Sequence, residues 1–119
     1  MSERYDAIIL GAGPAGLTAA IYLARARLVP LIVDTGTVGG QMVLSYEVAN
    51  YPGVESTTGH SIARTMLRQA ESFGAKVISQ ATITGLDLSG ETKVVKVEDE
   101  GIFESPILII AAGGRSRRL

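Results

Sequence analysis

The stretch AIILGAGPAGLTAA, residues 7–20, constrains the fold of this chain more than any other part of its sequence. The run from Tyr5 to Leu10 is almost continuously apolar, which is typical of a strand buried on both faces. Three glycines follow it: Gly11, Gly13 and Gly16. Apolar residues then return at helical spacing, with Pro14 suited to the first helical turn. The sequence therefore predicts a strand, a tight turn and a helix.

The rest of the chain continues this alternation. The helix that starts at Pro14 is expected to end near Leu28, because Pro30 disfavours helix for the residue before it. Further strands are expected at 30–34, 76–79, 83–88, 93–98, 102–104 and 107–112, and a second helix at 58–73. No regular period is present between 35 and 56. This order predicts an α/β fold, a Rossmann-like doubly wound parallel sheet with a small antiparallel β-meander insertion.

Composition excludes several classes of function. With 119 residues the chain is the size of one domain, and its net charge of −1 argues against a nucleic-acid partner. No apolar stretch approaches the roughly 20 residues of a membrane helix, and the polar amino terminus is unlike a signal peptide. The absence of cysteine excludes thiol chemistry by this chain and favours a cytoplasmic setting. No cluster of residues indicates a metal site.

The three glycines have the G-x-G-x-x-G spacing of a dinucleotide-binding turn. In such a turn the glycines allow a tight bend, close approach to a pyrophosphate and close helix–strand contact, while the helix N-terminus offers N–H groups to the phosphates. Asp34 follows at about the 20-residue spacing of a carboxylate that accepts from ribose hydroxyls. This pattern favours FAD or NAD over NADP. The alternatives are an ordinary strand–helix turn and a surface aspartate that caps its loop.

The next segment, GTVGGQMVLSYEVANYPG, narrows the choice of ligand. Gly39 and Gly40 let a backbone approach a flat ligand, and Gln41 and Asn50 carry both donors and acceptors. With LGAGPAGLTAAIYLARA and IIAAGG, this segment resembles the FAD domain of low-molecular-weight thioredoxin reductases, which are two-dinucleotide-binding-domain flavoproteins. The resemblance runs from Tyr5 to the final SRRL.

The resemblance implies a set of contacts with FAD. For the ADP half, it implies that the pyrophosphate meets Gly11, Gly13, Pro14, Ala15 and Gly16, the adenosine ribose meets Asp34 and Thr35, and the adenine meets the backbone near Ala81 and Thr82. For the flavin half, it implies that the ribityl and flavin region lies along Gly39, Gly40 and Gln41 and that the isoalloxazine contacts Asn50. The last strand would pass the cofactor at Ala112 and Gly113. The family usually has threonine where Ala112 stands, which puts a hydroxyl-mediated contact there in question. No side chain is expected to act as a catalytic acid or base.

The resemblance also implies an activity for the intact enzyme. Hydride would pass from NADPH to FAD, and electrons then to the disulfide of a thioredoxin-like protein, with the flavin supplying the chemistry. Family members continue into an NADPH domain that carries a C-x-x-C pair, and then return to complete the FAD domain. Residues 1–119 are therefore expected to form a single FAD-binding subdomain, incomplete at its C-terminus and inactive alone. The oligomeric state, including a homodimer, is left open.

Two rival interpretations stay open at this point. One is a ferredoxin or flavodoxin–NADP reductase of the same fold without the cysteine pair. The other is a non-catalytic module that binds adenine nucleotides tightly and shows no flavin colour.

Overall fold

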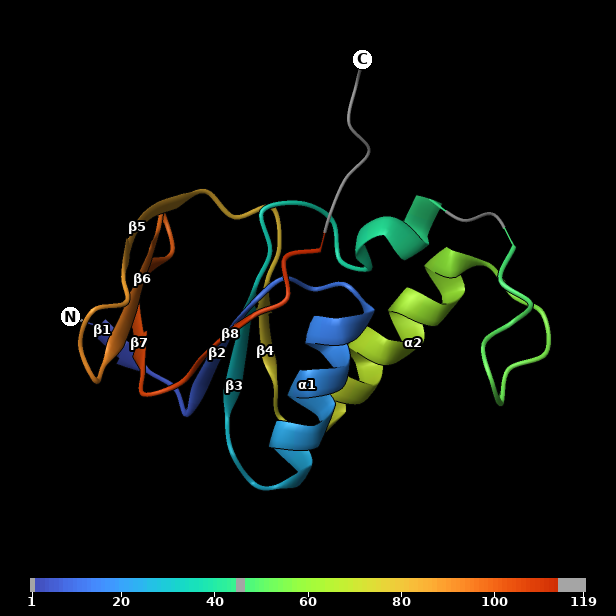
Figure 1. Ribbon diagram of the computed structural model, residues 1–119, viewed down its shortest axis with the longest axis horizontal. Coiled ribbons are helices and arrows are strands. Elements are labelled where there is room, and N and C mark those ends of the chain that lie inside the picture. Colours follow the sequence, from blue (N-terminus) through green and yellow to red (C-terminus); the bar gives the residue numbers. More distant parts are fainter. Residues whose placement is uncertain (1, 45–46, 114–119) are drawn as a thin grey trace, which may run out of the picture.

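A four-stranded parallel sheet lies in the middle of the fold, in the order β4-β3-β2-β8 (Figure 1). The computed structural model describes residues 2–44 and 47–113 of the chain. The strands of this sheet are β2 (Ala7–Leu10), β3 (Pro30–Val33), β4 (Lys76–Ile78) and β8 (Leu108–Ile110). Ile9 is paired with Ile32 on one side and Ile109 on the other. Because the strands are parallel, their carboxyl ends meet at one edge of the sheet.

Two helices cover one face of this sheet, α1 (Pro14–Arg25) and α2 (Gly59–Ser72) (Figure 1). Their apolar stripes pack on the sheet residues that point toward them, with Leu17 and Ile62 in the same buried cluster as Ile9. The Thr58 side chain caps α2 by accepting from the N–H of Ser61 at 3.1 Å. The helix layer therefore follows the apolar periodicity of the sequence.

A second sheet covers the opposite face, in the order β1-β7-β6-β5 (Figure 1). Its strands are β1 (Ser2–Arg4), β5 (Ile83–Asp87), β6 (Lys93–Val97) and β7 (Gly101–Ser105). Val95 and Phe103 of this sheet pack against Ile8 and Leu31 of the parallel sheet. Since neighbouring strand residues point to opposite faces, Ile8 belongs to this second core and Ile9 to the helical one.

The expected α/β class, the parallel sheet and the antiparallel meander are confirmed. Strand β1 was not expected, because its residues are polar and exposed; it exists through parallel pairing with β7. The segment expected to lack regular structure contains a short 3-10 helix, η1 (Gly40–Leu44). Among the described residues, no helix is long and apolar enough to cross a membrane.

Helix α1 ends at Arg25, earlier than the expected end near Leu28. Arg27 adopts a left-handed conformation with φ of 66° and donates its N–H to Ala24. The N–H of Leu28 reaches back to the carbonyl of Leu23 at 3.1 Å. This pair of bonds is a Schellman motif, in which glycine is the usual left-handed residue. Pro30 therefore limits only how far α1 could extend, and the Schellman motif ends the helix earlier, at Arg25.

We expect the substitution Arg27→Gly to stabilise the protein by about 1 kcal/mol, because glycine adopts the left-handed conformation without the cost that a Cβ imposes. Urea unfolding followed by circular dichroism measures this change. Arg27→Ala is the matched control, since it removes the same side chain but keeps the Cβ. A stabilisation of equal size in both variants would contradict the explanation.

The turn between β2 and α1 depends on two glycines for its packing. A Cβ on Gly16 would overlap the carbonyl oxygen of Gly11, and a Cβ on Gly11 would overlap the backbone of Ala111. Both glycines are buried. By contrast, a Cβ on Gly13 would meet nothing closer than the Cα of Gly40, at 3.9 Å. Gly11 and Gly16 therefore serve close backbone packing, while a Cβ on Gly13 would make only ordinary van der Waals contact with Gly40.

We expect Gly16→Ala to lower the free energy of unfolding by about 2–3 kcal/mol, because the added methyl group overlaps backbone that cannot move aside cheaply. Gly13→Ala should cost less than about 1 kcal/mol, the effect of alanine at a helix N-cap. Chemical denaturation of the two variants tests the contrast. Equal destabilisation would show that the two glycines do not differ in this way.

Candidate functional site

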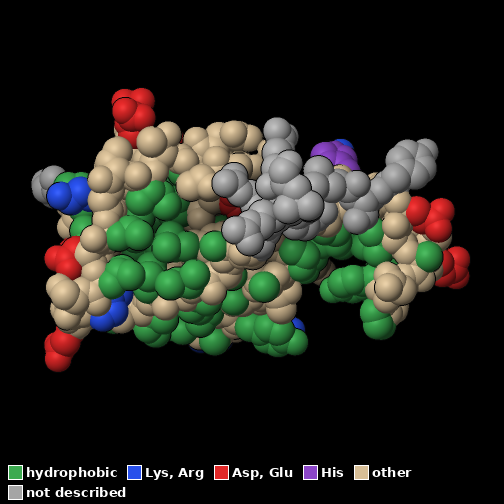
Figure 2. Space-filling view, turned by 45° about the horizontal axis from the view of Figure 1, so that its top comes forward, with side chains coloured by type: hydrophobic (Ala, Val, Ile, Leu, Met, Phe, Trp, Pro, Cys, Tyr) green, Lys and Arg blue, Asp and Glu red, His purple; other side chains and the backbone are tan. Residues whose placement is uncertain are grey.

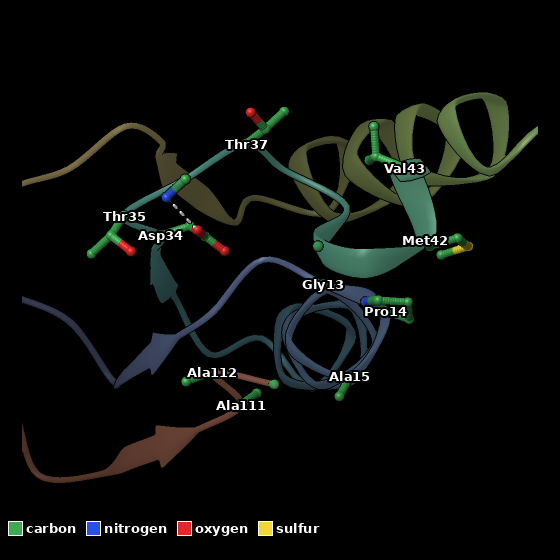
Figure 3. Close-up of a pocket in the computed structure, with 13 residues that line it drawn as sticks. Gly13, Pro14, Ala15, Asp34, Thr35, Thr37, Met42, Val43, Ala111 and Ala112 are labelled. Atoms are coloured by element: carbon green, nitrogen blue, oxygen red, sulfur yellow. Dashed lines mark hydrogen bonds between the residues drawn. The ribbon is translucent and has the colours of Figure 1, made fainter. Parts of the chain in front are cut away.

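A cleft of about 650 Å³ opens at the carboxyl ends of β2 and β3, beside the N-terminus of α1 (Figure 3). Three stretches of chain that are distant in sequence form its walls, within residues 13–15, 34–43 and 111–113. Its lining residues are Gly13, Pro14, Ala15, Asp34, Thr35, Gly36, Thr37, Gly40, Met42, Val43, Ala111, Ala112 and Gly113. Ligands of open α/β sheets bind at this position, outside the carboxyl ends of the strands.

The N-terminus of α1 forms one wall of the cleft (Figure 3). Gly13 is the N-cap residue and makes no side-chain cap, and the first turn carries no acidic residue. The N–H groups at the start of a helix have no partner within the helix, and its dipole places positive charge there. This wall is therefore suited to an anionic group such as a phosphate, which could approach the backbone at Gly13 without meeting a side chain.

Asp34 also lines the cleft, and its carboxylate holds two loops together. One oxygen accepts from the N–H of Ala12 at 2.6 Å. The other accepts from the N–H of Gly36 at 2.7 Å, the bond drawn as a dashed line in Figure 3. Each carboxylate oxygen has a second lone pair, so Asp34 can also accept from a ligand hydroxyl. The same side chain can thus position the glycine turn and bind a ligand.

The turn after β3 is also tied to the connection between β4 and β5. The N–H of Gln80 donates to the carbonyl of Gly36 at 3.0 Å, and that of Ala81 donates to the carbonyl of Asp34 at 2.9 Å. The Gln80 side chain donates from Nε2 to Oγ1 of Thr37 at 3.2 Å. These bonds fix residues 34–37, which form the Asp34 side of the cleft.

The third wall comes from η1. Gly39 donates its N–H to the carbonyl of Ala12 at 2.7 Å, which joins this segment to the glycine turn. Gly39 is buried, and a Cβ there would overlap the side chains of Val43 and Ala63. Its small size therefore serves packing against α2, whereas Gly40 lies on the surface of the cleft.

The structure brings eight of the expected site residues into the cleft lining: Gly13, Pro14, Ala15, Asp34, Thr35, Gly40, Ala112 and Gly113. Gly11, Gly16 and Gly39 are buried behind that lining. Gly11 also borders a smaller pocket of about 170 Å³, which shares Asp34, Thr35 and Ala112 with the cleft.

Three further expected residues of the described part of the chain lie away from the cleft lining. Asn50 and Thr82 are exposed outside it, and Ala81 is buried in the core between the two sheets. The side chain of Gln41 lies outside the described part of the chain. The lining also contains residues that the sequence analysis did not single out: Gly36, Thr37, Met42, Val43 and Ala111. Gly36 and Thr37 could have been found from their position directly after Asp34.

The lining residues favour binding over acid–base chemistry. Among the described residues that line the cleft, the polar groups are one carboxylate, two threonine hydroxyls and backbone groups, and none is lysine, arginine or histidine. In residues 2–44 and 47–113, no group of three or more His, Cys, Asp or Glu residues could hold a metal ion. His60, the one histidine of the sequence, is exposed in the first turn of α2.

Comparison with known proteins gives consistent similarities. The chain is 42% identical over 117 residues to a 34.2 kDa protein in the rubredoxin operon of Clostridium pasteurianum, covering 98% of this chain and 38% of that protein. It is 42% identical over 118 residues to the thioredoxin reductase of Peptoclostridium acidaminophilum, covering 98% of this chain and 37% of that protein. The chain thus spans less than two fifths of the length of these curated relatives.

Solved structures agree with the sequence relatives. The crystal structure of Lactococcus lactis thioredoxin reductase in its FR conformation superposes with a TM-score of 0.87 and 37% identity, covering 97% of this chain and 37% of that one. The model of one protein family, pyridine nucleotide-disulphide oxidoreductase, matches residues 5–119. The chain belongs to the pyridine nucleotide-disulphide oxidoreductase family.

Proposed function

We propose that this chain is the FAD-binding part of a flavoprotein oxidoreductase and holds the ADP end of FAD in the cleft. One observation carries the proposal. The uncapped N-terminus of α1 and Asp34 both line one cleft at the carboxyl ends of parallel strands. That arrangement offers positive potential to a pyrophosphate and a hydrogen-bond acceptor to a ribose.

The shape of the cleft fits such a ligand. A Cβ on Gly13 would meet no other side chain, with the Cα of Gly40 as its nearest neighbour at 3.9 Å, so the missing side chain leaves room for a phosphate to reach the backbone. In the proposed complex, Gly13, Pro14 and Ala15 bind the pyrophosphate, and Asp34 with Thr35 binds the adenosine ribose. Gly11 and Gly16 support this turn from behind the lining.

The remaining expected contacts are part of the same proposal. Gly40, Ala112 and Gly113 would follow the cofactor toward its flavin end, with Gly39 shaping η1 behind them. The residues proposed for the flavin ring are Gln41 and Asn50, and those proposed for the adenine are the backbone groups near Ala81 and Thr82. FAD supplies hydride and electron transfer when bound, and the residues of this chain bind and orient it.

For the whole protein we propose NADPH-dependent reduction of the disulfide of a thioredoxin-like protein, in the cytoplasm. The relative from P. acidaminophilum is named thioredoxin reductase. This name favours disulfide reduction over the activity of a ferredoxin–NADP reductase and over a non-catalytic module. This chain contains no cysteine, so the thiols of such a reaction belong to another part of the enzyme. The cytoplasm, where thiols are kept reduced, suits this chemistry.

We further propose that residues 1–119 form one subdomain whose sheet is extended by other parts of the enzyme. Edge strand β8 supports this proposal. Ile107, directly before β8, is 46% exposed, and Ile110, the last residue of β8, is 68% exposed. Figure 2 shows hydrophobic side chains gathered on the half of the molecule that carries the two sheets. Parallel sheets are normally covered, and long apolar edges promote aggregation unless they are paired.

We expect Gly13→Val to abolish FAD and ADP binding while the protein stays folded, because the branched side chain would fill the proposed pyrophosphate position. Isothermal titration with ADP and flavin fluorescence with FAD measure binding, and circular dichroism measures folding. The matched control is Val43→Ala, which enlarges the cleft instead of filling it. A folded Gly13→Val variant that binds ADP as tightly as the wild type would refute the proposed site.

We expect Asp34→Asn to weaken ADP binding by about 1.5–3 kcal/mol, the range for hydrogen bonds to a charged group. An asparagine can accept from only one of the two N–H groups that Asp34 binds, so the melting temperature should also fall. Titration is therefore carried out well below that temperature, where the variant is folded. Unchanged ADP affinity together with a lowered melting temperature would restrict Asp34 to a structural role.

A further inference from the structure

We propose that Gln80 is a positioning residue for the adenosine ribose of the cofactor. This inference rests on the proposed function, since it concerns the same cleft. Gln80 does not line the cleft. It acts on the ligand through residues 34–37, which it holds in place from the connection between β4 and β5.

Gln80 makes two contacts with this turn. Its backbone N–H donates to the carbonyl of Gly36 at 3.0 Å, and its Nε2 donates to Oγ1 of Thr37 at 3.2 Å. The residue adopts a left-handed conformation with φ of 55°, which directs both groups toward the turn. Non-glycine residues seldom adopt this conformation, and the surrounding structure must therefore maintain it.

Hydrogen bonds, and not apolar packing, hold the turn in place. Thr35 and Thr37 are both exposed, so little apolar surface anchors residues 35–37 to the core. The N–H of Gly36 donates to Oδ1 of Asp34 at 2.7 Å. Gln80, Gly36 and Asp34 therefore form one chain of contacts that ends at the carboxylate facing the cleft.

The function of this chain of contacts is to fix the direction of the Asp34 carboxylate. Loss of the side-chain bond between Gln80 and Thr37 leaves Gly36 held by the backbone N–H of Gln80. The Gly36 side of the Asp34 carboxylate is then less firmly constrained, while its bond to Ala12 remains. A carboxylate held on both sides is already oriented for a ribose hydroxyl, whereas a carboxylate held on one side must be ordered when the ligand binds. Preorganisation of this kind increases affinity.

The test uses the full 119-residue chain and three variants: Gln80→Asn, Thr37→Val and the double substitution. Asparagine tolerates the left-handed conformation, so Gln80→Asn keeps the backbone bond but shortens the side chain by one methylene. Thr37→Val removes the hydroxyl at nearly constant shape. We expect each single variant to bind ADP about 3- to 10-fold more weakly than the wild type, the range for one neutral hydrogen bond. The double variant should lose no more than either single variant.

A second ligand separates positioning from general stability. For 2′-deoxy-ADP, which lacks a ribose hydroxyl, the Gln80→Asn variant, whose altered side chain does not line the cleft, should bind as the wild type does. Gln69→Asn on α2 is the matched control and should leave the affinity for ADP unchanged.

Three results would overturn the proposal: unchanged ADP affinity in Gln80→Asn, additive losses in the double variant, or equal losses for ADP and 2′-deoxy-ADP in Gln80→Asn. Failure of the proposed function is distinguishable from these results, because the wild-type chain itself would then bind no ADP.

Discussion

The carboxylate of Asp34 connects the two loops on which the candidate site depends. Strands β2 and β3 are parallel neighbours, so the loops that follow them leave the sheet at the same edge. Asp34 stands at the end of β3 and accepts from Ala12 in one loop and from Gly36 in the other. The cleft exists between these loops because this bridge holds them at a fixed separation. The same charged side chain therefore holds the two loops of the candidate site and is the group proposed to bind the ribose.

Different glycines of the turn serve backbone packing and access to the N-terminus of α1. Gly11 and Gly16 approach other backbone so closely that no side chain fits, and this brings α1 tightly against the end of β2. Gly13 has free space before it and leaves the helix N-terminus open to the cleft. Backbone packing and access to the helix N-terminus therefore depend on different glycines of one motif, although all three are the same residue type.

Much of the fold could be predicted from periodicity. The strands at Ala7–Leu10 and Pro30–Val33 are buried on both faces and read as apolar runs, and α2 follows its apolar spacing closely. The prediction was incomplete where contacts distant in sequence decide the structure. Strand β1 is polar and exposed, and it forms only because β7 offers an edge to pair with. The end of α1 depends on a left-handed Arg27, which local preference disfavours.

Residue type and spacing along the chain were enough to predict the glycine turn, the helix start at Pro14 and the acid at Asp34. These features follow from local backbone requirements, which a sequence displays directly. The arrangement of these residues around the candidate cleft depends on tertiary contacts. The tertiary structure placed Thr37, Met42 and Val43 in the cleft. It also brought Gln80 to the turn after β3, because contacts between segments far apart in the chain leave no local pattern.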